Sequence, residues 1–425
     1  MRRCYVMQVL LATLGFGVVA ALIALSVGAP DCSSQQDAAP AAIAPAVSER
    51  LRKEIDSIEA LLPGLADRGA ALFLLADHYA PLGEQAKALA LLKECVGLNA
   101  GFVPDPGHNP SLRPLEANLE FRELLEQARR RYPPVHKAHV AFTVPQKDLF
   151  PEGLAVDASN GLFYMGSEHR KKIVKFTLTD GVSDFVKQDL YDLSPVGGVH
   201  VDPADHSVWA TTDAGVKRRP ELLHFDAQGK LLERYVEPGS MPHDLNDHVL
   251  RGTQEIFATD TEGNHVYRFD RAAHTFTEMK LHRPVFEPNG ITLSRDGNLL
   301  FIGDDLGVIG VDLHSNESTD VDPGAHNTLA GIDGLYWYKG DLVGVEYGTG
   351  VYRVMRWKLS PDGRTVVSSE VLERGTELVK NPTTGAIFEE NFYFMANTGI
   401  QNLENDKIAD ESKLEPVKIA AVALE

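Results

Sequence analysis

Residues 151–154 read Pro151-Glu152-Gly153-Leu154, a short polar element followed at once by the start of an apolar strand pattern. Elements of the same layout return five more times, at intervals of roughly 43 to 52 residues. A period of that length, built from short strands, indicates a β-propeller with one blade per repeat, here six blades. The further openings are Gly198-Val199-His200-Val201, Leu245-Asn246-Asp247-His248, Pro288-Asn289-Gly290-Ile291, Ile332-Asp333-Gly334-Leu335 and Thr384-Gly385-Ala386-Ile387.

Each repeat continues with a hairpin turn and further strands. Ser294-Arg295-Asp296-Gly297-Asn298 is one such turn, and Gly, Asn and Asp suit tight hairpin connections. The strand after it, Leu299-Leu300-Phe301-Ile302-Gly303, is apolar and predicts a buried second strand. A third strand type, such as Val266-Tyr267-Arg268-Phe269, alternates apolar and polar residues, so one of its faces should contact water.

The two ends of the repeat region predict how the ring closes. The run Lys418-Ile419-Ala420-Ala421-Val422-Ala423-Leu424 is a strong strand pattern after the sixth repeat. Propellers often close by combining their first and last segments in one blade. We therefore expect this strand to pair with Ala138-His139-Val140-Ala141-Phe142, and we assign the propeller to residues 136–425.

The N-terminus predicts contact with a membrane. Arg2-Arg3 precede an apolar run from about Val6 to Ala29, which is long enough to span a bilayer. An uncleaved anchor and a cleaved signal peptide both fit residues 1–29; the length favours the anchor, whereas Ser26-Val27-Gly28 offers a cleavage site. With the arginines inside, the rest of the chain would face the periplasm or exterior, or be secreted after cleavage.

A linker and a helical segment separate this run from the propeller. Residues 30–46 are rich in Ala, Ser, Gln and Pro, which is linker composition, and residues 47–135 show helical periodicity. Within the segment, 70–98 resembles one tetratricopeptide-like hairpin, and Pro114 to Arg131 predicts a further helix. The simpler interpretation is a cap that packs on the propeller or spaces it from the membrane. The alternative is a module that binds a protein partner.

Composition excludes several classes of function. The chain has 425 residues and a net charge of −19, which argues against nucleic-acid binding. Three cysteines cannot build a disulfide framework, and no cysteine and histidine cluster suggests a zinc finger. The Gly-x-Ser-x-Gly motif is absent, so a serine hydrolase triad finds no support.

The openings also carry the candidate chemistry. The innermost strand of each propeller blade begins near the central channel, so polar residues at equivalent openings converge there. Glu152, Asn246, Asn289 and Asp333 occupy such openings and offer two carboxylates and two amide oxygens, the ligands that Ca²⁺ prefers. Two carboxylates alone would repel each other, and a cation resolves that conflict. Asn-Gly or Asp-Gly alone indicates only a turn, but repetition in one pattern favours a metal site.

Three openings resemble motifs of the calcium-dependent six-bladed propeller lactonases, the family of gluconolactonase and regucalcin (senescence marker protein). The resemblance covers about residues 144–397 and rests on Pro151-Glu152-Gly153-Leu154, Pro288-Asn289-Gly290-Ile291 and Ile332-Asp333-Gly334-Leu335. By this resemblance Glu152, Asn289 and Asp333 would bind Ca²⁺. Leu245-Asn246-Asp247 is similar to the family motif whose asparagine lies near metal and substrate.

The resemblance implies hydrolysis of a lactone or related ester, in which the ion polarises the carbonyl group and activates a water molecule. Asp333 would be the base and Asn246 would orient the substrate. Three histidines lie in or close to openings, and imidazole is a common acid or base in catalysis. We name His243 as a further catalytic candidate and His200 as a substrate contact; His326 is an additional candidate base.

The chain departs from the family pattern beside Asn246. Asp244 stands where the regucalcin branch commonly has an arginine that contacts a sugar acid, and His248 rather than glycine follows Asp247. These departures put sugar-lactone specificity in doubt. The alternative function is therefore a non-catalytic propeller, in which the ion is structural and the surface or the helical segment binds a partner.

Overall fold

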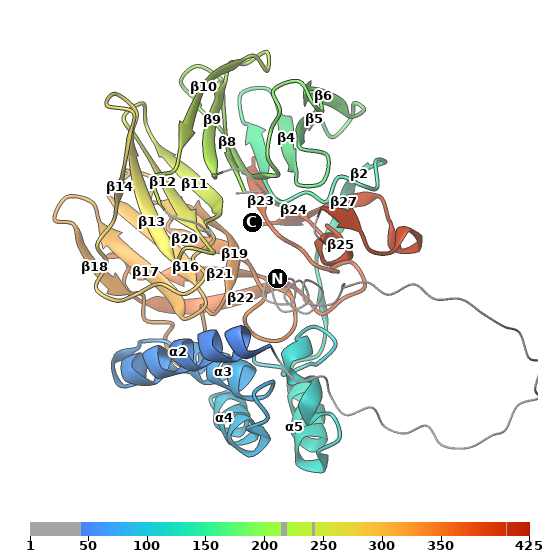
Figure 1. The fold of residues 1–425 in the computed structure, drawn as a ribbon, viewed down its shortest axis with the longest axis vertical. Helices are drawn as coiled ribbons and strands as arrows, with labels where there is room; N and C mark the ends of the chain where they lie inside the picture. The colour runs from blue at the N-terminus through green and yellow to red at the C-terminus, as the bar shows by residue number, and fades with distance from the viewer. Residues whose placement is uncertain (1–43, 214–218, 240–242, 405) are drawn as a thin grey trace, which may run out of the picture.

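The computed structural model describes residues 44–213, 219–239, 243–404 and 406–425. Six antiparallel sheets stand around a common axis, and the helices gather on one side of them (Figure 1). Five of the sheets have four strands and one has five. The predicted fold class, a mainly β six-bladed propeller preceded by a helical segment, is thus confirmed for these residues.

Each blade is a meander that runs from the axis to the rim. The innermost strands are β3 (Leu154–Asp157), β7 (Val196–Val201), β11 (Leu245–Arg251), β15 (Ile291–Leu293), β19 (Ile332–Tyr338) and β23 (Gly385–Phe388). The second strands are β4 (Leu162–Ser167), β8 (Val208–Thr212), β12 (Glu255–Asp260), β16 (Leu299–Asp304), β20 (Asp341–Glu346) and β24 (Asn391–Met395). The third are β5 (Lys172–Phe176), β9 (Glu221–Phe225), β13 (His265–Asp270), β17 (Gly307–Asp312), β21 (Arg353–Leu359) and β27 (Val417–Ala423). The outermost are β6 (Ser183–Val186), β10 (Leu231–Val236), β14 (Thr275–Glu278), β18 (Glu317–Asp320), β22 (Val366–Arg374) and β2 (His139–Val144).

The first and last strands close the ring in one blade, as the sequence predicts. β27 pairs with β24 on one side and with β2 on the other, and His139 lies opposite Ala421. β1 (Val135–His136) adds a fifth strand to the neighbouring blade by pairing with β22. A small hairpin, β25 (Leu403–Glu404) with β26 (Lys407–Ile408), lies in the loop that precedes β27.

The helical segment contains α2 (Pro45–Leu61), α3 (Arg68–Tyr79), α4 (Gln85–Gly97) and α5 (Leu119–Arg131). α3 and α4 pack against each other, where the sequence predicts a helical hairpin. The predicted helix from Pro114 is wrong at its start, because residues up to Leu115 form a 3-10 turn. The α-helix begins at Leu119, where the Asn118 side chain accepts hydrogen bonds from the next turn's amides and caps the helix.

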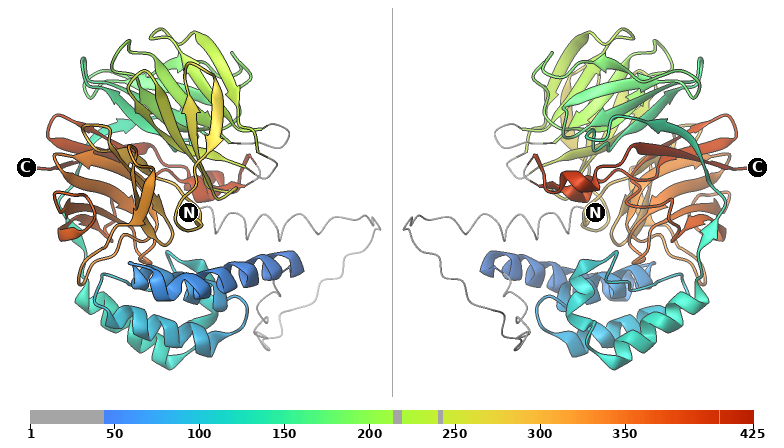
Figure 2. Two further views of the ribbon diagram at one scale, coloured as in Figure 1. Left: turned by 90° about the vertical axis from the view of Figure 1, so that its left-hand side faces the viewer. Right: turned by 90° about the vertical axis from the view of Figure 1, so that its right-hand side faces the viewer.

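The helical segment packs on the propeller, as its simpler interpretation predicts. The helices lie below the blades in both side views (Figure 2), and four propeller residues join their apolar core: Phe286, Leu306, Ala330 and Val351. Asp67 fastens the contact, because one carboxylate oxygen caps α3 at Ala70 N (3.0 Å) while the other accepts from Thr328 Oγ1 and Leu329 N, each at 2.7 Å. Both propeller partners are fully buried.

The predicted anchor or signal at residues 1–29 lies outside the described residues. Among the residues that the structure describes, no helix combines the length and apolar character needed to cross a bilayer.

Replacing Asp67 by alanine should lower the free energy of unfolding by about 2 to 4 kcal/mol. The change removes a helix cap and leaves the buried Thr328 hydroxyl and Leu329 amide without an acceptor. Urea unfolding measures the loss. The matched control is Asp56→Ala on an exposed position of α2, which should change stability by less than about 0.5 kcal/mol. Equal stabilities for the two variants would contradict the role given to Asp67.

Candidate functional site

The strand register identifies equivalent residues in the inner strands of different blades. In three blades the same register irregularity follows the first paired residue, which is Val196, Leu245 or Ile332. Those three residues are therefore equivalent, and so are the residues that follow them.

Close contacts between neighbouring inner strands extend this equivalence to the other blades. A Cβ atom on Gly153 would lie 2.3 Å from the carbonyl oxygen of Gly197, and one on Gly290 would lie 2.6 Å from that of Asp333. The Cα of Thr384 stands 3.0 Å from the corresponding position on Gly334. We call the preceding residues the opening level; it consists of Glu152, Gly197, Asn246, Asn289, Asp333 and Thr383.

Two of the predicted openings are wrong by two residues. The openings of blades two and six begin at Val196 and Pro382, so His200 lies three residues beyond the opening level on β7. The doublets Gly197-Gly198 and Thr383-Thr384 explain the error. Where a small residue is repeated, the sequence of the opening can be aligned with those of the other blades in more than one way. The four predicted metal ligands belong to the openings that were aligned correctly, and all four lie at the opening level.

All four predicted ligands are buried, with 2 to 7% of each residue exposed. Two of them touch: Asn289 Nδ2 donates to Asp333 Oδ1 at 2.9 Å. Asn289 Oδ1 is buried and has no hydrogen-bond partner among the described residues, which costs about 1 to 3 kcal/mol. Asn246 Nδ2 donates to Thr261 Oγ1 at 2.9 Å, which leaves its amide oxygen as the atom for a cation. The pairing of Glu152 with the others in one ion site stays a prediction.

Threonine hydroxyls from neighbouring blades fix the backbone of the opening level, and the sequence analysis missed them. Each hydroxyl donates to the carbonyl oxygen of a level residue, so the side chains start from positions held by two blades. The only sequence signal is a threonine near the end of a second strand or beside an opening. The pairs are Thr211 with Asn246 (2.6 Å), Thr259 with Asn289 (2.8 Å) and Thr384 with Glu152 (2.5 Å).

Tyr336 is a second residue that the sequence analysis missed. Its hydroxyl accepts from Gly385 N at 2.7 Å, which links the inner strands of blades five and six. Burial, and next the negative charge of Asp247, raise the pKa of Tyr336 well above its ordinary value, and Asp333 adds to the effect. The Tyr336 hydroxyl therefore stays protonated close to Asp247 and to the predicted ligand Asp333.

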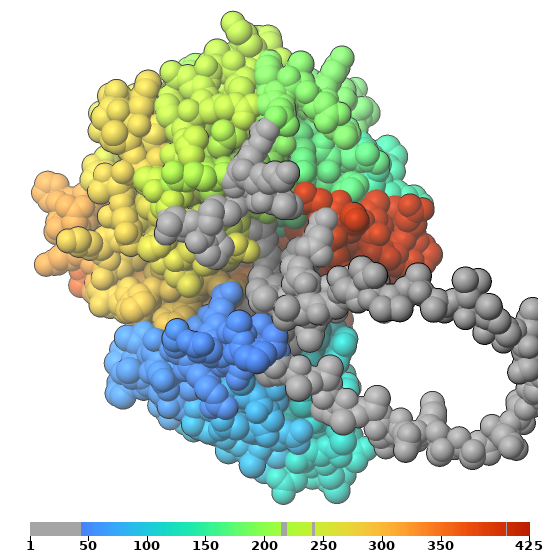
Figure 3. Space-filling view, in the orientation of Figure 1, coloured from blue at the N-terminus to red at the C-terminus, as the bar shows by residue number. Residues whose placement is uncertain are grey.

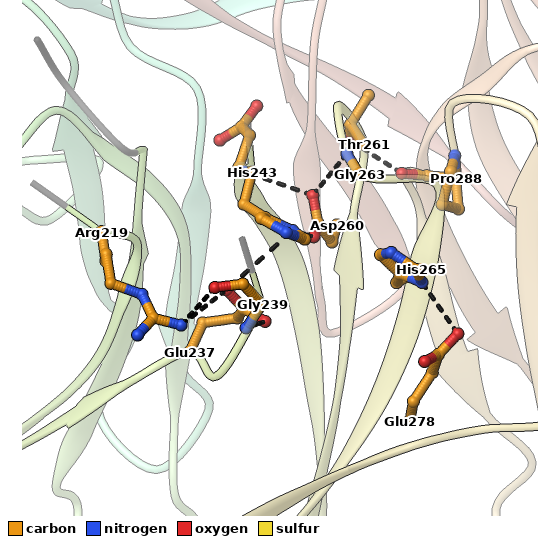
Figure 4. A network of polar contacts seen from close by, with 11 residues as sticks. Arg219, Glu237, Gly239, His243, Asp260, Thr261, Gly263, His265, Glu278 and Pro288 are labelled. Atoms are coloured by element: carbon orange, nitrogen blue, oxygen red, sulfur yellow. Dashed lines mark hydrogen bonds and ion pairs between the residues drawn. The ribbon is translucent and has the colours of Figure 1, made fainter. Parts of the chain in front are cut away.

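His243 lies in a buried polar network beside the opening level (Figure 4). Its Nδ1 contacts Asp260 Oδ2 and lies 3.9 Å from Glu237 Oε2. Burial raises the pKa of Asp260, whereas the hydrogen bond from His243 opposes that rise. Thr261, next to Asp260, connects this network to Asn246. The catalytic role of His243 stays a prediction.

The other two candidate histidines have different surroundings. His200 Nε2 lies 3.3 Å from Asp247 Oδ1, and its ring packs edge-on against His248. His326 Nδ1 instead lies 3.1 Å from the carbonyl oxygen of Leu98, at the contact between propeller and helical segment. This contact gives His326 a structural role, so no catalytic role is needed to account for it.

A cavity of about 450 Å³ lies between the helical segment and the loops of blades five and six. Phe73 and Asp77 of α3 form one wall, and Tyr352 and Asn381 belong to the opposite one. Asn381 is two residues before Thr383 of the opening level, and no residue of the opening level itself lines the cavity. The Tyr352 hydroxyl accepts from Asn381 Nδ2 at 2.7 Å, which fixes that wall. Figure 3 shows the helical segment directly against the propeller surface.

Comparisons with known proteins found no matching family model and no matching curated protein. Solved structures similar to this chain include a luciferin-regenerating enzyme (14% identity, 68% of this chain, 95% of that chain, TM-score 0.48). A virginiamycin B lyase from Staphylococcus aureus has 15% identity over 67% of this chain and 99% of its own (TM-score 0.47). A gluconolactonase from Xanthomonas campestris has 14% identity over 69% of this chain and 98% of its own (TM-score 0.46). We transfer no activity from these similarities.

Replacing Gly290 by alanine should destabilise the propeller by about 1 to 3 kcal/mol, because the new methyl group would overlap backbone atoms of the next blade. The same overlap should displace Asp333. Urea unfolding measures the change. The control is Gly181→Ala, where an added Cβ meets nothing within 4 Å. If both variants unfold at the same urea concentration, the close approach of the inner strands does not limit residue 290.

Proposed function

We propose that the opening level binds a divalent cation, in first place Ca²⁺, through Glu152, Asn246, Asn289 and Asp333. We further propose that the protein is a metal-dependent hydrolase of the gluconolactonase type, acting on a lactone or related ester. The observation that carries the proposal is the hydrogen-bonded Asn289 and Asp333 pair with its buried, unpartnered amide oxygen.

The donor atoms fit such an ion. Two carboxylates and two amide oxygens are all hard oxygen ligands, and Ca²⁺ takes six to eight of them, which leaves places for water or substrate. No histidine belongs to the opening level among the described residues, so the set favours Ca²⁺ over Zn²⁺. A bound cation would also offset the repulsion between Glu152 and Asp333, both of which are buried.

When bound, the cation would polarise a carbonyl oxygen and lower the pKa of a water molecule. The Asp333 carboxylate, held by the Asn289 amide, would accept the proton of the attacking water. The water oxygen then bonds to the carbonyl carbon, the ester C–O bond breaks, and the proton passes to the leaving oxygen. Asn246 would orient the substrate, and the protonated Tyr336 hydroxyl supplies a further polar contact. His243 and His200 remain the candidate catalytic and substrate-contact histidines.

In this proposal the substrate occupies the cavity between the helical segment and the loops of blades five and six. Its volume of about 450 Å³ falls within the range of small-molecule sites. Tyr352, Asn381 and Gln401 line it with hydroxyl and amide groups, which suit a polar ring, and Phe73 adds an aromatic face. The helical segment would then shape the pocket. Asp244 stands in place of the arginine that would contact a sugar acid, so we favour neutral lactones and esters as substrates.

The alternative is a non-catalytic propeller in which the ion is structural and the surface or the helical segment binds a protein partner. Asp244 favours it, because the position lacks the arginine expected for a sugar-acid substrate. Contact of the N-terminus with a membrane, and a location in the periplasm or outside the cell, are further proposals that rest on residues 1–29.

Replacing Asp333 by alanine should abolish Ca²⁺ binding, because it removes a charged ligand and the partner of Asn289. Isothermal titration after chelator treatment measures the affinity. At 100 times its Kd, Ca²⁺ should stabilise the wild type by about 2.7 kcal/mol and the variant not at all. The control is Asp362→Ala, in an exposed turn. Unchanged Ca²⁺ affinity in the Asp333 variant would overturn the ligand assignment.

The hydrolase proposal predicts turnover of neutral lactones or aryl esters that a chelator abolishes and Ca²⁺ restores. The full chain should be used, because removing the helical segment would expose the apolar core that it shares with Phe286 and Leu306. Asn289→Ala should lower kcat, while Asp362→Ala should not. A protein that binds Ca²⁺ but turns over nothing on a broad panel would favour the binding-module alternative.

A further inference from the structure

A second group of metal-ligating side chains lies just beyond the opening level, between blades two and three. We call it the histidine cluster; it consists of His200 on β7 with Asp247 and His248 on β11. His200 Nε2 lies 3.3 Å from Asp247 Oδ1, and the two imidazole centroids are 4.6 Å apart. One ligand atom from each residue can be chosen so that all three lie within 4.8 Å of one another. The proposed hydrolysis assigns no role to His248.

His248 provides an independent observation that something is missing from this cluster. The residue is fully buried, yet neither ring nitrogen has a hydrogen-bond partner among the described residues. An unsatisfied buried polar group costs about 1 to 3 kcal/mol, so such a side chain needs a ligand or a water molecule. Imidazole nitrogens without a hydrogen-bond partner are suitable metal ligands.

We propose that His200, Asp247 and His248 form a second metal site, for a borderline transition ion such as Zn²⁺. Ligand bonds of about 2.0 to 2.1 Å in a tetrahedral site place neighbouring ligand atoms about 3.3 Å apart. The His200 and Asp247 atoms already have that separation. Asp247 also supplies the negative charge, and its Oδ1 is fixed by the His248 amide at 2.8 Å.

The ligand types separate the two proposed sites. Imidazole nitrogens favour Zn²⁺ and similar ions, whereas the oxygen-only opening level favours Ca²⁺. Asn246 belongs to the proposed Ca²⁺ site and Asp247 to the histidine cluster. The two sites are therefore neighbours along β11. The histidine cluster does not depend on lactone hydrolysis, because metal binding can be measured directly.

A different histidine and acid group, Glu237 with His243 and Asp260, has a weaker claim. His243 Nδ1 already hydrogen-bonds to Asp260, and Arg219 lies 4.0 Å from Glu237 Oε2. Its imidazole is thus already bonded through Nδ1, whereas both ring nitrogens of His248 are without a partner among the described residues. It serves as the internal competitor in the experiment.

Co²⁺ is the probe, because its visible absorption differs between nitrogen-rich, four- or five-coordinate sites and oxygen-only, six-coordinate sites. The chelator-treated full chain, saturated with Ca²⁺, should bind one equivalent of Co²⁺ with the intense nitrogen-type spectrum. His200→Asn and His248→Gln should each raise the Kd for Co²⁺ by more than about tenfold. Asp333→Ala should keep the spectrum, which separates this site from the proposed Ca²⁺ site.

The matched control is His206→Asn, since the His206 ring also contacts an aspartate (Asp157, 2.9 Å) but is not part of the histidine cluster. It should leave Co²⁺ binding unchanged. The proposal is overturned if the folded wild type shows only an oxygen-type spectrum. It is equally overturned if both cluster variants bind as the wild type does, or if only His243→Asn removes the spectrum. Where a variant fails to fold, an oxygen-type spectrum of the wild type still overturns the proposal.

Discussion

The close approach of neighbouring inner strands is the constraint on which the site depends. Gly153 faces the backbone of Gly197 to Val199, and Gly290 faces that of Asp333 to Leu335, with no room for a side chain at either glycine. Because backbone meets backbone there, the residues one position earlier occupy equivalent places in neighbouring blades. Threonine hydroxyls then bond their carbonyl groups across blades. The acids and amides of the opening level are thus positioned by rigid backbone rather than by loops.

The helical segment is part of the same folded unit. Its apolar core includes Leu306 and Val351 of the propeller, and Asp67 bonds to residues of both parts. The helical segment also lines the cavity at the loops of blades five and six. Substitutions in the helical segment, for example at Phe73, could therefore change the cavity without altering the strands that hold the candidate ligands.

The sequence predicted the architecture well because period, turn residues and strand patterns all report local structure. The six blades and the pairing of β27 with β2 are confirmed. Prediction failed where neighbouring residues are alike, as at Gly197-Gly198, where two frames fit equally well. It also missed what only the assembled ring creates: the threonine bonds between blades, the Tyr336 hydroxyl and the buried His248 ring. The roles given to Glu152, Asn246, Asn289, Asp333, His200 and His243 remain predictions, since ligand binding is not a property of the backbone pattern.

Closure of the ring by β27 has a consequence for synthesis of the chain on the ribosome. Blade six needs residues 417–423 between β24 and β2, so its sheet cannot be completed until residue 423 has been synthesised. Until then β2 lacks its partner strand β27, and the ring of six blades cannot close. A chain that stops before residue 417 would therefore form an open arc in which the strand edges of β2 and β24 lack their partner.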